Sequence, residues 1–260
     1  MDILDVVWTA EKDEFKCSLL KGSTPSKYEA CSNDGIWAMS LSKSEKARYS
    51  DQDTLRILRS SMEYYKYTIN NFCCGAFNPD GKSFSICTIG TLTIYNAESG
   101  DSIDAFPIHS ITNSNGSHSW GVSSISYHPN GKTIVTSAFD NVAIWDVNTG
   151  KCIHALRGHS GSINSAVFSP NGKYVITTSQ DRTIKIWSTD TGMLIASINA
   201  RSVAEHASFS PDGKQIVSAY SDGTICLWDF PPLQQLIDET RERFKNRPLT
   251  PEEQRKYYLE

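Results

Sequence analysis

The segment GHSGSINSAVFSPNGKYVITTSQDRTIKIWSTDTGMLIASI, from Gly158 to Ile198, decides the fold. Its first two runs of alternating apolar residues are separated by Pro170-Asn171-Gly172, which is typical of a β-hairpin turn. The whole segment predicts four short strands, each next to its neighbour in the sequence.

The same pattern recurs along the chain. Its turn glycines are Gly81, Gly131, Gly172 and Gly213, with spacings of 50, 41 and 41 residues. A weaker copy lies upstream, where Gly35 stands 46 residues before Gly81 and Leu58 replaces the Trp that closes the third strand. A period near 41 residues with four strands in each repeat predicts the blades of a β-propeller.

The N-terminal segment DILDVVWTAEKDEFKCSLLKG (Asp2 to Gly22) has the layout of VAIWDVNTGKCIHALRG (Val142 to Gly158). In both, an apolar run ends in Trp, a polar turn follows, and a Lys-Cys pair opens the next run. Residues 2–21 are therefore predicted to be a third and a fourth strand. Two interpretations are open: FKCSLLKG completes the last blade of a five-bladed ring, or the chain is an open arc of a longer protein. The duplicated third strand favours the arc.

The expected organisation is an all-β propeller over residues 1–230 and a helical tail over 231–260. Its parts are a partial blade at 2–21 and blades at 27–67, 70–108, 120–157, 161–198 and 202–230.

The turn glycines, the pairs Trp145-Asp146 and Trp228-Asp229, and Gly158-His159 resemble the WD-repeat family. The resemblance covers residues 2 to about 230 and is most specific in 119–230. It implies a WD-repeat β-propeller of about five blades, as a closed or an incomplete ring.

In this family a hydrogen-bonded chain runs from an indole N–H through a hydroxyl and an imidazole to a turn carboxylate. The resemblance assigns this structural network to His118, Thr136, Asp140 and Trp145, to His159, Thr177, Asp181 and Trp187, and to Ser218, Asp222 and Trp228. In the last set Ala200 occupies the histidine position. A catalytic triad has similar members, but it would occur once in a cleft rather than on successive blades. We interpret the set as structural, because a buried indole or imidazole without a partner costs about 1–3 kcal/mol.

The rest of the sequence gives little indication of a catalytic, cofactor-binding or metal-binding site. There is no P-loop and no CxxC pair, so we expect no catalytic residue, no cofactor and no metal ligand. The net charge of −4 and the lack of any apolar run of ~18 residues argue against nucleic-acid and membrane partners. Seven cysteines without an export signal predict reduced thiols and a cytoplasmic protein.

Candidate partner-binding residues come from two places. In the family, the residue before each turn Asp faces the central channel, which gives Phe139, Gln180 and Ser221. Trp120 ends an inserted Ser/Asn-rich loop that starts at Pro107. Because the three channel positions differ in character, they favour a protein partner over a symmetric ligand site.

The tail PPLQQLIDETRERFKNRPLTPEEQRKYYLE has Leu233, Leu236, Ile237 and Phe244 at helical spacing. Its LTPEE stretch resembles the ending of bacterial multidomain WD-repeat proteins in which a propeller follows an effector or ATPase region.

The sequence therefore predicts a non-catalytic protein–protein interaction scaffold or sensing module, as the C-terminal recognition part of a larger regulatory protein. The open strand edges of an arc would also allow self-association. The alternatives are a propeller-type hydrolase and a propeller with a small-ligand site in its central channel.

Overall fold

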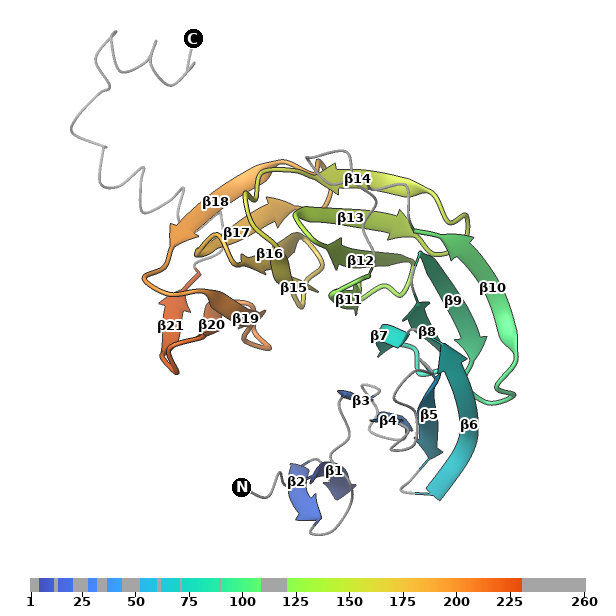
Figure 1. Ribbon diagram of the computed structural model, residues 1–260. Coiled ribbons are helices and arrows are strands. Elements are labelled where there is room, and N and C mark those ends of the chain that lie inside the picture. The colour runs from blue at the N-terminus through green and yellow to red at the C-terminus, as the bar shows by residue number, and fades with distance from the viewer. Residues whose placement is uncertain are drawn as a thin grey trace, which may run out of the picture.

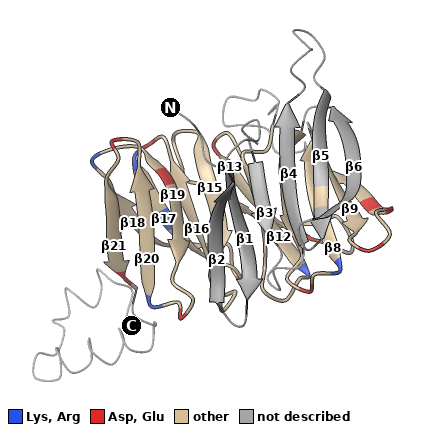
Figure 2. Ribbon diagram, turned by 90° about the horizontal axis from the view of Figure 1, so that it is seen from below, with Lys and Arg blue, Asp and Glu red and all other residues tan. Residues whose placement is uncertain are grey.

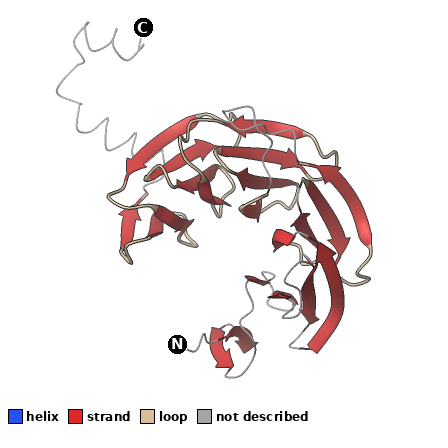
Figure 3. Ribbon diagram, in the orientation of Figure 1, coloured by secondary structure: helices blue, strands red, loops and turns tan. Residues whose placement is uncertain are grey.

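The computed structural model describes the backbone of residues 5–11, 14–20, 28–31, 37–43, 52–59, 62–70, 72–88, 90–108 and 121–230. Every regular element in these ranges is a β-strand, as Figure 3 shows. None of the described residues forms a helix long and apolar enough to cross a membrane. His118, Trp120, the expected turn at Gly35 and the expected tail helix at 231–260 lie outside the described residues.

The strands form six antiparallel sheets in which sequence neighbours pair. The first is a two-stranded sheet of β1 (Asp5–Glu11) and β2 (Glu14–Leu20). The second contains β3 (Tyr28–Cys31), β4 (Trp37–Lys43), β5 (Gln52–Arg59) and β6 (Met62–Asn70). The third contains β7 (Phe72–Phe77), β8 (Ser83–Thr88), β9 (Thr91–Asn96) and β10 (Ser102–Pro107).

The remaining sheets form the C-terminal half of the described chain. One contains β11 (Ser124–Tyr127), β12 (Thr133–Ala138), β13 (Asn141–Asp146) and β14 (Cys152–Leu156). The next contains β15 (Ile163–Phe168), β16 (Tyr174–Ser179), β17 (Thr183–Ser188) and β18 (Leu194–Asn199). The last contains β19 (Ala204–Phe209), β20 (Gln215–Tyr220) and β21 (Ile225–Asp229).

The sheets follow one another around an arc (Figure 1). The first strand of each four-stranded sheet lies on the concave side and the fourth strand on the convex side. Among the described residues, Lys, Arg, Asp and Glu lie mainly at the turns along the two edges of the stack (Figure 2). This all-β architecture of antiparallel three- and four-stranded sheets is consistent with a β-propeller.

Successive sheets bury apolar faces against each other. One cluster joins Val135, Val142 and Ile144 to Ala166, Phe168 and Val175 of the next sheet. The following cluster joins Ile176, Ile184 and Ile186 to Ala207, Phe209 and Ile216. Burying one such aliphatic side chain contributes about 1.5–3 kcal/mol. Each sheet is therefore stabilised mainly by its two neighbours.

A polar contact also links the hairpin turns of successive sheets. Asn78 Nδ2 donates to the carbonyl oxygen of Gly131 at 3.2 Å, and His128 Nε2 lies 3.1 Å from that of Gly172. Gly131 and Gly172 have φ of 70° and 71°, in the left-handed region that favours glycine. A Cβ atom built on Gly172 would lie 2.1 Å from His128 Nε2. Glycine is thus needed there for both conformation and space.

We expect Gly172→Ala to destabilise the protein more than Gly213→Ala. Both positions have φ near 70°, so each substitution carries about 1–2 kcal/mol of left-handed strain. Only Gly172→Ala also displaces the His128 ring, because a Cβ on Gly213 meets nothing within 4 Å. Urea unfolding of both variants measures the difference. Equal losses of stability would show that the contact between turns is weak.

Candidate functional site

The four residues of one predicted network form a continuous hydrogen-bonded chain. Trp187 Nε1 on β17 donates to Thr177 Oγ1 on β16 at 2.9 Å. His159 Nε2, in the segment before β15, lies 2.7 Å from Thr177 Oγ1, and His159 Nδ1 lies 2.8 Å from Asp181 Oδ2 in the β16–β17 turn. These hydrogen bonds thus link two strands and two connecting segments of one sheet.

The protonation states of His159 and Asp181 determine which group donates in each of these hydrogen bonds. Burial lowers the pKa of His159 and outweighs its hydrogen bond to Asp181, so the imidazole is neutral at pH 7. Burial alone would raise the pKa of Asp181, but hydrogen bonds from Thr183, His159 and the Ser160 N–H lower it to about 2. Nδ1–H therefore donates to the carboxylate, and Nε2 accepts the Thr177 hydroxyl proton. The Thr177 oxygen in turn accepts the indole N–H, so every polar group has a partner.

The sheet of β11–β14 contains a bond equivalent to that between Trp187 and Thr177. Trp145 Nε1 donates to Thr136 Oγ1 at 2.8 Å. Asp140 Oδ1 accepts a hydrogen bond of 3.0 Å from Asn141 Nδ2. His118, the expected link between them, lies outside the described residues.

The last sheet differs from the expectation. Trp228 Nε1 donates to Ser218 Oγ at 2.8 Å, but Ser218 then donates to Tyr220 Oη at 2.9 Å. Asp222 does not join this chain, contrary to the prediction: it is exposed and accepts from the Thr224 N–H. With Ala200 in the histidine position, nothing connects Ser218 to the turn carboxylate. Tyr220 stands where the previous sheet has Ser179, and this difference was the available signal in the sequence.

The predicted partner-binding residues lie at the turns between second and third strands. Ala138 pairs with Asn141, so Phe139 and Asp140 form a two-residue hairpin turn. Phe139 has φ of 50°, and it is 45% exposed. Its carbonyl oxygen accepts a 2.5 Å hydrogen bond from the Ile163 N–H of the next sheet. The structure therefore holds an exposed aromatic side chain on a backbone conformation that bulky residues rarely adopt.

Gln180 and Ser221 occupy the corresponding turns of the next two sheets. Both are exposed, and Ser221 Oγ lies 2.9 Å from Ser202 Oγ. The β16–β17 turn is one residue longer than the turn at Phe139, and its positive φ falls on Arg182, at 62°. Trp120, the fourth candidate, lies outside the described residues.

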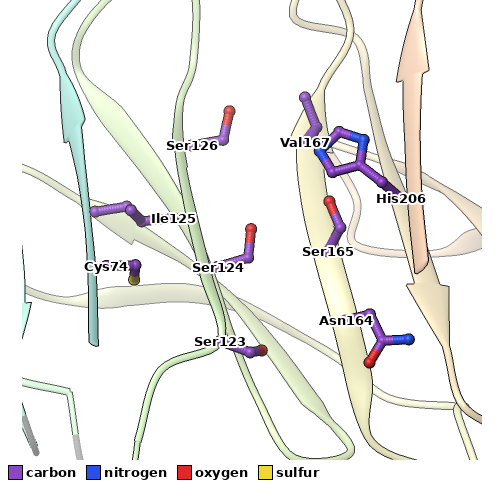
Figure 4. A pocket seen from close by; sticks show the side chains of 9 residues that line it. All are labelled: Cys74, Ser123, Ser124, Ile125, Ser126, Asn164, Ser165, Val167 and His206. Carbon is purple, nitrogen blue, oxygen red and sulfur yellow. The ribbon is translucent and has the colours of Figure 1, made fainter. Parts of the chain in front are cut away.

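A cavity of about 340 Å³ lies among the first strands of neighbouring sheets (Figure 4). Its lining consists of Cys74, Ser123, Ser124, Ile125, Ser126, Asn164, Ser165, Val167 and His206. Asn164 Nδ2 is bonded to the Ala204 carbonyl oxygen at 2.9 Å, and burial of the His206 ring lowers its pKa. The serine and asparagine groups thus share the lining with apolar side chains, among them Ile125 and Val167. Within the described ranges, no group of three His, Cys, Asp or Glu residues is placed to hold a metal ion.

The Trp–hydroxyl bonds between second and third strands are those that the resemblance to WD repeats predicts. The family model described as "WD domain, G-beta repeat" matches residues 107–146, 150–188 and 196–229. These three matches support a WD-repeat family for the chain. The search of curated proteins finds no match to the chain.

We expect Thr177→Val to destabilise the protein by about 1–3 kcal/mol, because it leaves the Trp187 N–H and His159 Nε2 buried without a partner. Thr177→Ser is the matched control, since it keeps the hydroxyl and removes one methyl group. Chemical unfolding measures both variants. If the Val variant is as stable as the Ser variant, the hydrogen bonds of the Thr177 hydroxyl do not contribute to stability.

Stability should also depend on pH through Asp181 and His159. The folded pKa of Asp181 is below its ordinary value of 3.8, so its contribution is present above pH 4 and is lost as the pH falls towards 2. The pKa of His159 is also lowered, so protonation of the unfolded chain reduces stability as the pH falls through 6.5.

We expect Asp181→Asn to flatten the profile between pH 4 and 2, measured as unfolding midpoint against pH. Asp190→Asn, which changes an exposed carboxyl of the same sheet, is the control and should keep the wild-type slope. An unchanged slope in the Asp181 variant would contradict this assignment.

Proposed function

We propose that this protein is a non-catalytic protein-binding scaffold or sensing module, acting as the C-terminal recognition part of a larger bacterial regulatory protein. The observation that carries the proposal is the match of three segments to WD repeats. Such repeats generally mediate protein–protein interactions, and WD40 domains are typically non-catalytic scaffolds. The LTPEE-type tail sequence supports the larger regulatory context.

The burial of the His159 network supports a structural rather than a catalytic role. Thr177 and the His159 side chain are both 0% exposed. A nucleophile and its general base must reach a substrate, and these two groups face only protein. The repeated Trp–hydroxyl bonds of Trp145 and Trp228 serve the neighbouring sheets in the same way.

The turn of Phe139 is the best-supported contact point for a partner. Exposed aromatic side chains on a rigid scaffold are common binding hot spots. Gln180 and Ser221, at equivalent turns, would supply polar contacts around it, and Trp120 would add a second aromatic group. Free thiols at Cys74, Cys87, Cys152 and Cys226 are compatible with a reducing, cytoplasmic location.

The test is affinity capture with the full chain, followed by titration of the purified partner against variants. Phe139→Asn should weaken binding at least tenfold, because the ring is lost, while the melting temperature stays the same or rises. Asparagine tolerates the left-handed conformation, so folding is preserved. Ile195→Asn, which changes a 48% exposed residue of outer strand β18, is the matched control and should bind normally.

Unchanged affinity of the Phe139 variant would exclude this turn as the contact point. A chain that captures no protein, but whose melting temperature rises saturably with a small neutral polyol at concentrations too low for a general osmolyte effect, would contradict the scaffold proposal. That result would favour a ligand site in the Ser/Asn-lined cavity.

A further inference from the structure

One face of the last sheet is apolar and open to solvent among the described residues. Val217 on β20 is 43% exposed, and Ile225 and Leu227 on β21 are 71% and 64% exposed. Val217 lies directly opposite Leu227 in the strand register, and Ala219 lies opposite Ile225. The side chains therefore form one continuous patch, which we call the end face, at one end of the arc in Figure 1.

The same positions are covered in the preceding sheet. Val217, Ile225 and Leu227 stand 6, 14 and 16 residues after Pro211, and Ile176, Ile184 and Ile186 stand at the same distances after Pro170. These three isoleucines are at most 1% exposed, because they pack against the last sheet. In the sheet before that, Val135, Val142 and Ile144 are equally buried. The end face thus has the same apolar residue types as the faces that a following sheet buries.

A covering segment follows directly in the sequence. Strand β21 ends at Asp229, and Pro231 and Pro232 have no N–H to donate to a strand ladder. Phe230, just before them, packs its ring against Tyr174 and Phe209, with centroids 5.3 and 5.4 Å apart. The point at which the next segment starts is therefore fixed beside the last sheet.

The sequence of that segment is complementary to the end face. Leu233, Leu236, Ile237 and Phe244 have i, i+3, i+4 and i+11 spacing, which would place them on one stripe of a helix. The acidic residues Asp238 and Glu242 and the basic residue Lys245 would lie on the opposite side. Leu233 is six residues after Leu227, and each extended residue spans about 3.3–3.6 Å, so the stripe can reach the patch.

We propose that residues 232–245 form an amphipathic helix that covers the end face, with Leu233, Leu236, Ile237 and Phe244 packed on Val217, Ile225 and Leu227. Stacked repeats need a terminal unit that is apolar inside and polar outside, and this segment has both properties. The helix replaces the further sheet that covers each earlier face.

A double-mutant cycle in the full chain tests the contact. Leu227→Ala and Ile237→Ala should each raise the unfolding equilibrium constant about tenfold, and the double variant should raise it by clearly less than the hundredfold product. The control pair, Ile195→Ala with Ile237→Ala, should be additive, because Ile195 lies on outer strand β18 of another sheet. Glu242→Gln, on the polar side of the stripe, should leave stability unchanged.

Dye binding and sedimentation show whether the end face is covered by residues 232–245, left open for another protein, or covered by a second copy of the chain. The wild-type chain should bind little of an apolar-surface dye, and Leu236→Asp with Ile237→Asp should increase that binding. Additive effects of Leu227→Ala and Ile237→Ala would overturn the proposal. So would strong dye binding by the wild type, which would leave the end face open for another protein. A wild-type dimer that Leu227→Asp converts to monomer would assign the face to a second copy and also overturn it.

Discussion

Each sheet of this protein can bury its apolar face only against the neighbouring sheet, and the rest of the structure depends on this constraint. Ile176, Ile184 and Ile186 reach near-zero exposure because the last sheet lies on them. Stability is therefore a sum of contacts between neighbours along the arc. Residues at the edges of the stack take little part in these contacts, so the turns there can differ between sheets without loss of the fold.

Inside a sheet, the second constraint is the indole N–H of the closing Trp. Trp145, Trp187 and Trp228 all donate to a hydroxyl on the second strand. A hydroxyl can accept that bond and still donate one of its own, so the next acceptor is open to variation. It is His159 in one sheet and Tyr220 in the next. What the fold requires is a satisfied donor, and several residue types meet that requirement.

The parts of the structure that repeat within one sheet could be predicted from the sequence. The spacing of the turn glycines indicated the strand order, and the offset from the turn proline placed Thr177 beside Trp187. The same offset placed Asp222 in a network that it does not join, although Ala200 in the histidine position already removed the imidazole link. Contacts between sheets were missed altogether. The bond from His128 to the Gly172 carbonyl depends on how far apart two turns lie in space, and no period along the chain gives that distance.

The turn at Phe139 shows why departures from the repeat are informative. The hairpin between β12 and β13 is one residue shorter than that between β16 and β17, and this moves the positive φ onto Phe139. Glycine or asparagine would adopt this conformation at lower cost, since strain at such positions is on the order of 1–3 kcal/mol. The hydrogen bond from the Ile163 N–H holds the strained backbone in place. Because 45% of the residue stays exposed, burial offsets this strain only in part, so the cost of the conformation is carried mainly by the backbone contact to the next sheet.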